Sequence, residues 1–216
     1  MSEIPTIRAV LFDIGNVLLR FDFRLALDKL ALQSEVGDAV EILGQLDRVK
    51  QAYEDGQIDR ASFVRAAFDV LRYRGTEAEF TAAWEDIFEP NTPMIELVEQ
   101  LHGKIPLYLL SNTNDIHLDY VWRTYPFFSL FSGGVFSHKA RASKPGREIF
   151  DAVCRQCSLE PASTFFIDDL LPNIETARKL GFQCHHYHHD QHDALLAELR
   201  EAGVLAETAG ETDTAL

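Results

Sequence analysis

The stretch AVLFDIGNVLLRFD, residues 9–22, opens with an apolar run that stops at Asp13. A short apolar run bounded by polar and small residues predicts a buried β-strand. Gly15 and Asn16 follow the aspartate before the apolar residues resume. The stretch therefore predicts a carboxylate at the end of a buried strand, with a glycine two residues after it.

The pattern of a short apolar run ending in polar or small residues recurs along the chain. Each such run predicts a buried strand, although the last is weaker than the others. The predicted strands cover residues 7–13, 105–112, 133–137, 163–168 and 182–187.

Helical patterns separate the later strands. They cover residues 91–103, 146–158 and 172–181, and the last of them ends on a glycine, as helices often do. Strands that alternate with helices predict an α/β fold, in which a parallel sheet is covered by helices on both faces.

The segment from Phe23 to Glu89 breaks this alternation, because it shows amphipathic helical patterns and no convincing strand. We interpret it as a helical insertion above the carboxyl edge of the sheet, where open α/β sheets bind ligands. The predicted division is a core over 1–20 and 90–205, a helical cap over 21–89, and a polar, disordered tail over 206–216.

Composition limits the classes of function. The chain has 216 residues, 46% of them hydrophobic, which is enough for a substantial core. A formal net charge of −14 argues against nonspecific binding to nucleic acid or to an anionic membrane. Three cysteines and the lack of a signal-peptide pattern predict a cytoplasmic protein, and no apolar stretch approaches the ~18 residues of a membrane span. Nothing in the sequence indicates an oligomeric state.

Polar residues follow four of the predicted strands. In a parallel sheet all carboxyl ends lie on one edge, so these side chains are expected to surround a single cavity. They are Asp13 after the first strand, Ser111 and Asn112 after the second, Lys144 after the third, and Asp168 and Asp169 after the fourth.

This set of residues suits phosphoryl transfer through a carboxylate. Asp13 can attack phosphorus to form an aspartyl-phosphate that water later hydrolyses. Attack by an anion on a dianion requires positive charge, and Mg²⁺ prefers oxygen ligands such as the carboxylates of Asp13, Asp169 and Asp168. Asn173 is expected to orient the acidic pair.

The remaining strand-end residues are predicted to bind the phosphoryl group. Lys144 adds a second positive charge against its oxygens, and the Ser111 hydroxyl donates a hydrogen bond, with Asn112 nearby. The predicted substrate is a small phosphate ester.

Four motifs, in this order and spacing, resemble those of the haloacid dehalogenase-like hydrolases, and in particular their Mg²⁺-dependent phosphatases. The resemblance runs from about Arg8 to His188, and it implies a Rossmann-like core with a helical cap that closes over a small phosphorylated metabolite such as a sugar phosphate. A stretch over 53–63, YEDGQIDRASF, is similar to one common in such caps. The motifs are LFDIGNVL (11–18), LLSNT (109–113), SKPGREIF (143–150) and FFIDDLLPNIETARKLG (165–181).

Gly15 departs from the family pattern. The resemblance implies that its carbonyl still binds the metal, but most family phosphatases carry a second aspartate there as the general acid and base. Loss of such a group typically costs about 10²–10⁴ in rate. FDxGNV resembles a subset regarded as sugar-phosphate phosphatases, and Asn16, Asp22 or water are the candidates to replace the missing acid.

Three alternative functions use some of the same residue types. A 2-haloacid dehalogenase uses the same nucleophile without a metal, but the pair Asp168 and Asp169 would repel its carboxylate substrate. A phosphate- or partner-binding module with weak or no turnover is favoured only by Gly15. A phosphorylated signalling receiver has its motifs in another order on a chain about half as long.

Two further patterns invite a metal or redox interpretation. The stretch HHYHHDQHD, residues 185–193, has five histidines but no recurrent ligand spacing, so we interpret it as a polar strand end and loop. Cys154 and Cys157 have the separation of a redox pair, but on a helix they share one face, and no second pair follows. We interpret them as residues on a core-facing helix turn.

Overall fold

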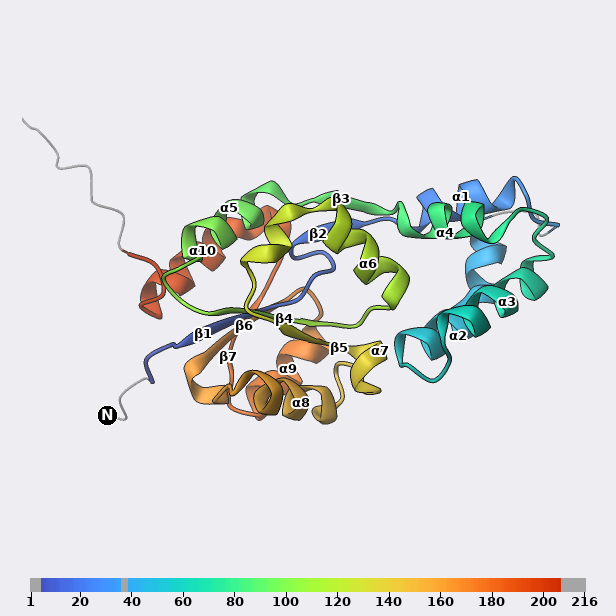
Figure 1. Ribbon diagram of the computed structural model, residues 1–216. Helices are drawn as coiled ribbons and strands as arrows, with labels where there is room; N and C mark the ends of the chain where they lie inside the picture. The colour runs from blue at the N-terminus through green and yellow to red at the C-terminus, as the bar shows by residue number, and fades with distance from the viewer. Residues whose placement is uncertain (1–4, 36–38, 207–216) are drawn as a thin grey trace, which may run out of the picture.

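The computed structural model describes residues 5–35 and 39–206, and its centre is a five-stranded parallel sheet (Figure 1). In the sheet, β1 is flanked by β4 on one side and β6 on the other, so Val10 lies beside both Leu107 and Phe165. The order is β5-β4-β1-β6-β7, with β1 (Ala9–Phe12), β4 (Leu107–Ser111), β5 (Gly134–Phe136), β6 (Thr164–Asp168) and β7 (Gln183–His186). The predicted α/β fold with a Rossmann-like parallel sheet is confirmed.

Helices cover both faces of the sheet, because successive strand residues point to opposite sides. Val10 and Phe12 belong to the core beneath α5 (Thr92–Leu101), α6 (Asp115–Thr124) and α10 (His192–Glu201). Leu11 and Phe166 belong to the core beneath α8 (Arg147–Cys157) and α9 (Leu171–Lys179). Figure 1 shows α5 and α10 above the sheet and α8 and α9 below it.

Each observed strand of this sheet lies within the range predicted for it. The helices predicted over 91–103, 146–158 and 172–181 correspond to α5, α8 and α9, of which α9 begins one residue earlier than predicted. The helices α6 and α10 were not predicted. Short segments complete the core, namely α7 (Ser137–Ala140) and 3₁₀ turns over Pro126–Leu130, Pro161–Ser163 and His189–Gln191.

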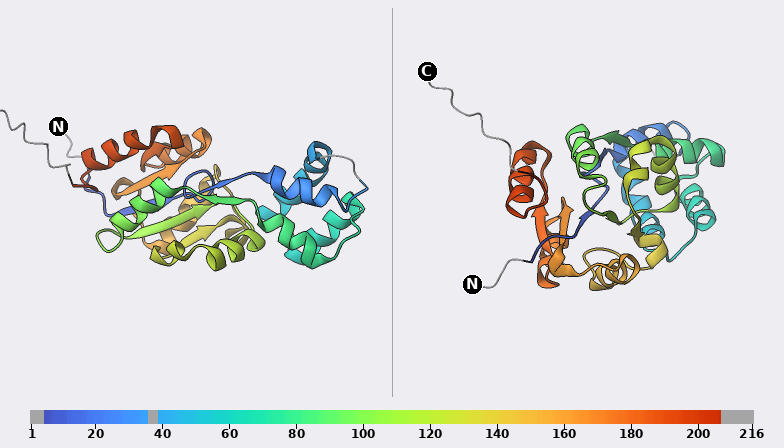
Figure 2. Two further views of the ribbon diagram at one scale, coloured as in Figure 1. Left: turned by 90° about the horizontal axis from the view of Figure 1, so that it is seen from above. Right: turned by 60° about the vertical axis from the view of Figure 1, so that its left-hand side comes forward.

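Four helices form a separate bundle beside one edge of the sheet (Figure 2). Its own core contains Tyr53, Phe63, Phe80 and Trp84, each at most 1% exposed. Phe63 and Trp84 therefore pack inside the bundle. The helices are α1 (Phe23–Ala31), α2 (Ala39–Glu54), α3 (Arg60–Leu71) and α4 (Glu77–Glu85), and we call this bundle the cap.

A two-stranded antiparallel ribbon joins the cap to the core. It pairs β2 (Leu19–Phe21) with β3 (Phe88–Pro90), and Phe21 lies opposite Phe88. The expectation of no strand between Phe23 and Glu89 was wrong at this end of the segment, because β3 begins inside it. Each strand has only three residues, too few for an alternating pattern, and their pairing depends on the chain's return from the cap. The exact division at 21–89 stays a prediction.

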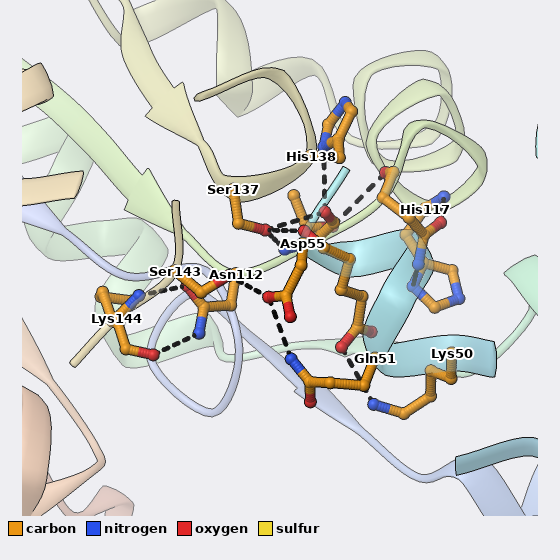
Figure 3. Close-up of polar contacts among 12 residues, drawn as sticks. Lys50, Gln51, Asp55, Asn112, His117, Ser137, His138, Ser143 and Lys144 are labelled. Carbon is orange, nitrogen blue, oxygen red and sulfur yellow. Dashed lines mark hydrogen bonds and ion pairs between the residues drawn. The ribbon is translucent and has the colours of Figure 1, made fainter. Parts of the chain in front are cut away.

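The end of α2 is fixed to the core by several polar contacts (Figure 3). The Ser143 hydroxyl and the Gln51 amide both donate to the Asp55 carboxylate, and Tyr53 donates to Asp115 on α6. The Ser137 hydroxyl donates to the main-chain carbonyl of the last residue of α2. This part of the cap is therefore held against the ends of β4 and β5.

Gly56 allows the chain to pass close to the core at this contact. Its φ of +66° favours glycine, and a Cβ atom there would lie 2.2 Å from the carbonyl oxygen of His138. We expect Gly56→Ala to lower the free energy of unfolding by at least about 1 kcal/mol in urea. Gly44 on α2 has open space around a Cβ, so Gly44→Ala is expected to stabilise the protein instead. Equal effects of the two changes would contradict this account of the contact.

Among the described residues, none of the helices combines the length and apolar character that crossing a bilayer requires. Ala206 is exposed, and the rest of the predicted tail over 206–216 lies outside the described residues.

Candidate active site

The strand-end residues meet at the carboxyl edge of the sheet, as the parallel topology predicted. Asp13, Ser111, Lys144 and Asp169 line one cavity of about 260 Å³ between the core and the cap. Asp168 lies immediately behind it, at 0% exposure. The other lining residues are Ile14, Gly15, Asn16, Phe21, Phe23, Lys50, Glu54, Ile87, Phe88, Asn112, Thr113, His117, Val121, Leu170 and Asn173.

Lys144, in the third motif, contacts the first and the fourth motif through two buried ion pairs. Its Nζ lies 2.9 Å from Asp13 Oδ1 and 2.6 Å from Asp168 Oδ2, and its side chain is 1% exposed. Burial alone would lower the pKa of this ammonium, but the two carboxylates outweigh it and raise the pKa of Lys144. Lys144 is therefore a fixed positive charge beside Asp13.

Asp13 is buried, and its Oδ1 accepts a hydrogen bond of 2.7 Å from the main-chain N–H of Ile14. Burial raises the pKa of Asp13 to about 7, with the charges of Asp168 and Asp169 adding to this and Lys144 opposing it. Ionised Asp13 is thus crowded by other negative charge, which a nearby cation relieves.

Carboxylate oxygens of Asp13, Asp168 and Asp169 lie within 4.8 Å of one another, and no other comparable group of acids, histidines or cysteines occurs in the described ranges 5–35 and 39–206. Hard oxygen donors suit Mg²⁺, and the mutual repulsion of these acids fits a divalent cation. Lys144 occupies one oxygen of Asp168, whereas the Asp169 carboxylate accepts a hydrogen bond of 3.0 Å from the Asn16 amide. The site therefore fits the expected magnesium ion.

Asn112 and Asn173, the two asparagines predicted to belong to the site, each form hydrogen bonds with another residue of the site. The Asn173 amide donates to Asp168 Oδ1 at 2.9 Å, which agrees with the orienting role expected for it. The Asn112 amide donates to the carbonyl of Lys144 and accepts from its N–H, both at 2.8 Å. Asn112 lines the cavity, but its side chain is engaged in positioning Lys144, so direct binding of substrate by it stays a prediction.

The residue two after Asp13 could carry a side chain only if the ring of Phe21 moved. A Cβ atom on Gly15 would lie 2.9 Å from a ring carbon of Phe21. Asp22, one of the candidates to replace the missing acid, is not among the residues that line the cavity. It caps α1 and forms an ion pair with Arg24 that lowers the pKa of Asp22.

Several cavity residues were not predicted as part of the site. Lys50 and Glu54 enter from α2, and Thr113 and His117 from the segment after β4. The similarity of 53–63 to a family cap stretch was the only signal near the first pair. The cap's position over the sheet, which brings them to the cavity, is a tertiary feature.

The other two patterns are structural. The histidine-rich stretch forms the end of β7, the 3₁₀ turn after it and the first residues of α10, so the predicted loop is partly helical, and His186 Nε2 contacts the Asp169 carbonyl at 2.8 Å. Cys154 and Cys157 are half-buried on α8, and they pack against the core beneath it. Burial raises the pKa of Cys154 to about 11, which disfavours the reactive thiolate.

A family model described as haloacid dehalogenase-like hydrolase matches residues 7–181, and the chain belongs to this family. Its curated relatives include D-ribitol-5-phosphate phosphatase of Bacteroides thetaiotaomicron, which is 27% identical over 82% of this chain and 90% of that protein. A sesquiterpene phosphatase of Aspergillus oryzae is 24% identical over 82% and 87% of the two chains.

Among solved structures, a HAD family enzyme from Bacteroides thetaiotaomicron in complex with magnesium and inorganic phosphate superposes with a TM-score of 0.77. It is 28% identical, and the match covers 86% of this chain and 96% of that one. The resemblance drawn from the four motifs is thus confirmed at the level of the family.

Proposed function

We propose that the protein is a Mg²⁺-dependent phosphatase that hydrolyses a small phosphate ester through an aspartyl-phosphate intermediate. The observation that carries this proposal is the position of Lys144, which bridges Asp13 and Asp168 beside Asp169 in one cavity. A nucleophilic carboxylate, a fixed cation and two further acids are the set that this chemistry requires. The phosphatase names of the two curated relatives support the same reaction class.

In the proposed reaction Asp13 is the nucleophile, and Lys144 and the Ser111 hydroxyl bind the oxygens of the transferring group. Asp13, Asp169 and the Gly15 carbonyl would hold Mg²⁺, with Asp168 close by and oriented by Asn173. A bound Mg²⁺ neutralises negative charge on the phosphoryl group. Lys144 keeps Asp13 in place and lowers the repulsion between its carboxylate and the phosphate.

We propose further that the substrate is a sugar or sugar-alcohol phosphate. The named substrate of the Bacteroides relative is of this class, whereas the Aspergillus relative is named for a sesquiterpene. The cavity of about 260 Å³ lies below the usual range of about 300–1,000 Å³ for larger ligands. Its size therefore favours a short ester over a fifteen-carbon hydrocarbon chain.

Phosphate release from a panel of phosphorylated metabolites, assayed with Mg²⁺ and with EDTA, tests this proposal. We expect hydrolysis of sugar and sugar-alcohol phosphates that EDTA suppresses and added Mg²⁺ restores, because the acids of the site need a cation beside the phosphate. Full activity in EDTA would contradict the metal-dependent mechanism. If no compound of the panel releases phosphate, the alternative of a phosphate-binding module is favoured. Gly15 is the one feature that supports that alternative.

A double change of the acidic pair separates phosphatase from dehalogenase chemistry. Asp168→Asn with Asp169→Asn removes two of the three clustered carboxylates, so we expect it to abolish phosphate release. A metal-free dehalogenase would survive this change, and chloride release from 2-chloropropionate by the double variant would support that alternative.

A further inference from the structure

The cavity lacks a general acid at the position where most family phosphatases carry one, and this inference rests on the proposed phosphatase function. Departure of an alcohol from phosphorus requires a proton on the leaving oxygen, unless that oxygen is already a weak base. Gly15 offers none, and the ring of Phe21 fills the space beside it. Any acid must therefore come from another element that lines the cavity.

Most titratable groups of the cavity already have other partners. Lys144 is fixed between Asp13 and Asp168, and Asp169 stands in the proposed metal site. His117 contacts the Asn114 amide and the Trp84 carbonyl through its two ring nitrogens. Burial lowers the pKa of this histidine to about 4, so its ring is neutral and engaged. The cap then supplies the remaining candidates.

Lys50 and Glu54 are these candidates, and both face the cavity from α2. Their side chains form an ion pair of 3.0 Å, with 16% and 13% of the side-chain surface exposed. A carboxylic acid is a much stronger acid than an alkylammonium group, so Glu54 is the better proton donor of the two.

The main chain of Glu54 is fixed relative to the strand end that binds phosphate. Its carbonyl accepts a hydrogen bond of 2.5 Å from Ser137, whose hydroxyl also accepts from the Thr113 N–H at 2.9 Å. Figure 3 shows Ser137 and Lys50 in this region, where the cap meets the core. Thr113 lies two residues after Ser111, so these contacts anchor the Glu54 main chain near the proposed phosphoryl site, and both Glu54 and Ser111 line the cavity.

The surroundings of Glu54 also make it a weaker acid than an ordinary glutamate. Burial raises the pKa of Glu54, the charges of Asp55 and Asp47 raise it further, and Lys50 opposes them. The titratable groups that line the same cavity from the core are Asp13, Lys144 and Asp169, together with neutral His117 on α6. Glu54 thus keeps its proton to a higher pH than an ordinary glutamate.

We propose that Glu54, from the cap, is the catalytic acid that protonates the leaving oxygen of the substrate. An oxygen of Asp13 bonds to phosphorus while the ester P–O bond breaks, and the Glu54 proton passes to the departing alcohol. In the second step the Glu54 carboxylate takes a proton from water, whose oxygen bonds to phosphorus as the Asp13–phosphate bond breaks. Inorganic phosphate leaves, and both side chains return to their starting states.

The test compares two esters that differ in their need for an acid. D-Ribitol 5-phosphate has a strongly basic leaving oxygen, whereas p-nitrophenyl phosphate has a weakly basic one. We expect Glu54→Gln to lower kcat/KM about 10²–10⁴-fold for the first ester and less than about 10-fold for the second. The ratio kcat/KM is used because it covers the step in which the alcohol leaves. Glu77→Gln, on the exposed surface of α4, is the matched control and should change neither value.

Retained hydrolysis of the nitrophenyl ester shows that the Glu54→Gln variant is folded. An equal loss with both esters, or no loss with either, would overturn the inference while leaving the phosphatase proposal intact. A leaving-group-dependent loss in Lys50→Met but not in Glu54→Gln would assign the role to Lys50 instead. A wild-type protein that cleaves only the nitrophenyl ester also contradicts the inference, and one that cleaves neither overturns the proposed function as well.

A pH profile gives an independent readout. Deprotonation of Glu54 should lower kcat/KM for D-ribitol 5-phosphate as the pH rises, and Glu54→Gln should remove this fall. Because Lys50 lowers the pKa of Glu54, Lys50→Met should move the fall to higher pH. A fall that stays at the same pH in both variants would contradict the assignment.

Discussion

Asp13→Asn is expected to lower phosphate release by about 10⁴-fold or more, the effect typical of losing a nucleophile. An amide has almost the same shape as the carboxylate but cannot form the aspartyl-phosphate. Phosphate release in saturating Mg²⁺ measures the effect, with p-nitrophenyl phosphate as the substrate because it needs the least help from an acid. Activity close to that of the wild type would remove Asp13 from the mechanism.

The Asp13→Asn variant should remain folded, so a loss of its activity can be assigned to the missing nucleophile and not to unfolding. Lys144 keeps its partner Asp168 at 2.6 Å, and the crowding of negative charge around position 13 is relieved. We therefore expect the urea midpoint in EDTA to be no lower than that of the wild type. A large fall in that midpoint would show that the carboxylate itself supports the fold.

Lys144→Met is expected to destabilise the metal-free protein by about 3–5 kcal/mol, because it leaves two buried carboxylates without their cation. Urea unfolding in EDTA measures this loss. The matched control is Lys29→Met, because Lys29 forms a surface ion pair of 2.6 Å with Asp86. The side chains of Lys29 and Asp86 are 46% and 57% exposed. Exposed pairs contribute about 0–1 kcal/mol, so the control should be nearly neutral.

The loss in Lys144→Met should depend on pH and on metal. The pKa of Asp13 is about 7 in the folded protein, against an ordinary value of 3.8. Loss of Lys144 removes the positive charge that opposes this rise in pKa. A carboxyl with a raised folded pKa destabilises the protein more as the pH rises, so the loss should shrink from pH 7 toward pH 4. Added Mg²⁺ should recover part of it. A loss that is equal at both pH values and insensitive to Mg²⁺ would contradict the charge argument.

Much of the candidate site was predictable because parallel topology turns sequence order into spatial position. Once Asp13, Ser111 and Lys144 are recognised as residues that follow strands, they must lie on one edge of the sheet. The acidic pair follows the fourth strand by the same rule, and Asn173 lies one helical turn beyond it. The distances of 2.6–2.9 Å around Lys144 agree with this expectation.

The cap side of the cavity was not predictable in the same way. Amphipathic patterns indicate that a helix has a buried face, but they do not say which end of α2 touches the core. Lys50 and Glu54 are ordinary charged residues of a helix until α2 is fixed at its end by Ser137 and Ser143. The ribbon of β2 and β3 was not predictable either, because three-residue strands carry no periodic signal of their own.

The sequence by itself determined the five strands of the parallel sheet, three of the helices that pack on it, the carboxyl-edge location of the site and the residue types that meet there. These follow from local hydrophobic periodicity and from the geometry of parallel sheets. The tertiary structure alone decided that Phe21 fills the space beside Gly15 and that Glu54 lines the same small cavity as Asp13. Both depend on how two separately packed units are placed against each other, and contacts between residues far apart in the chain leave no periodic trace in the sequence.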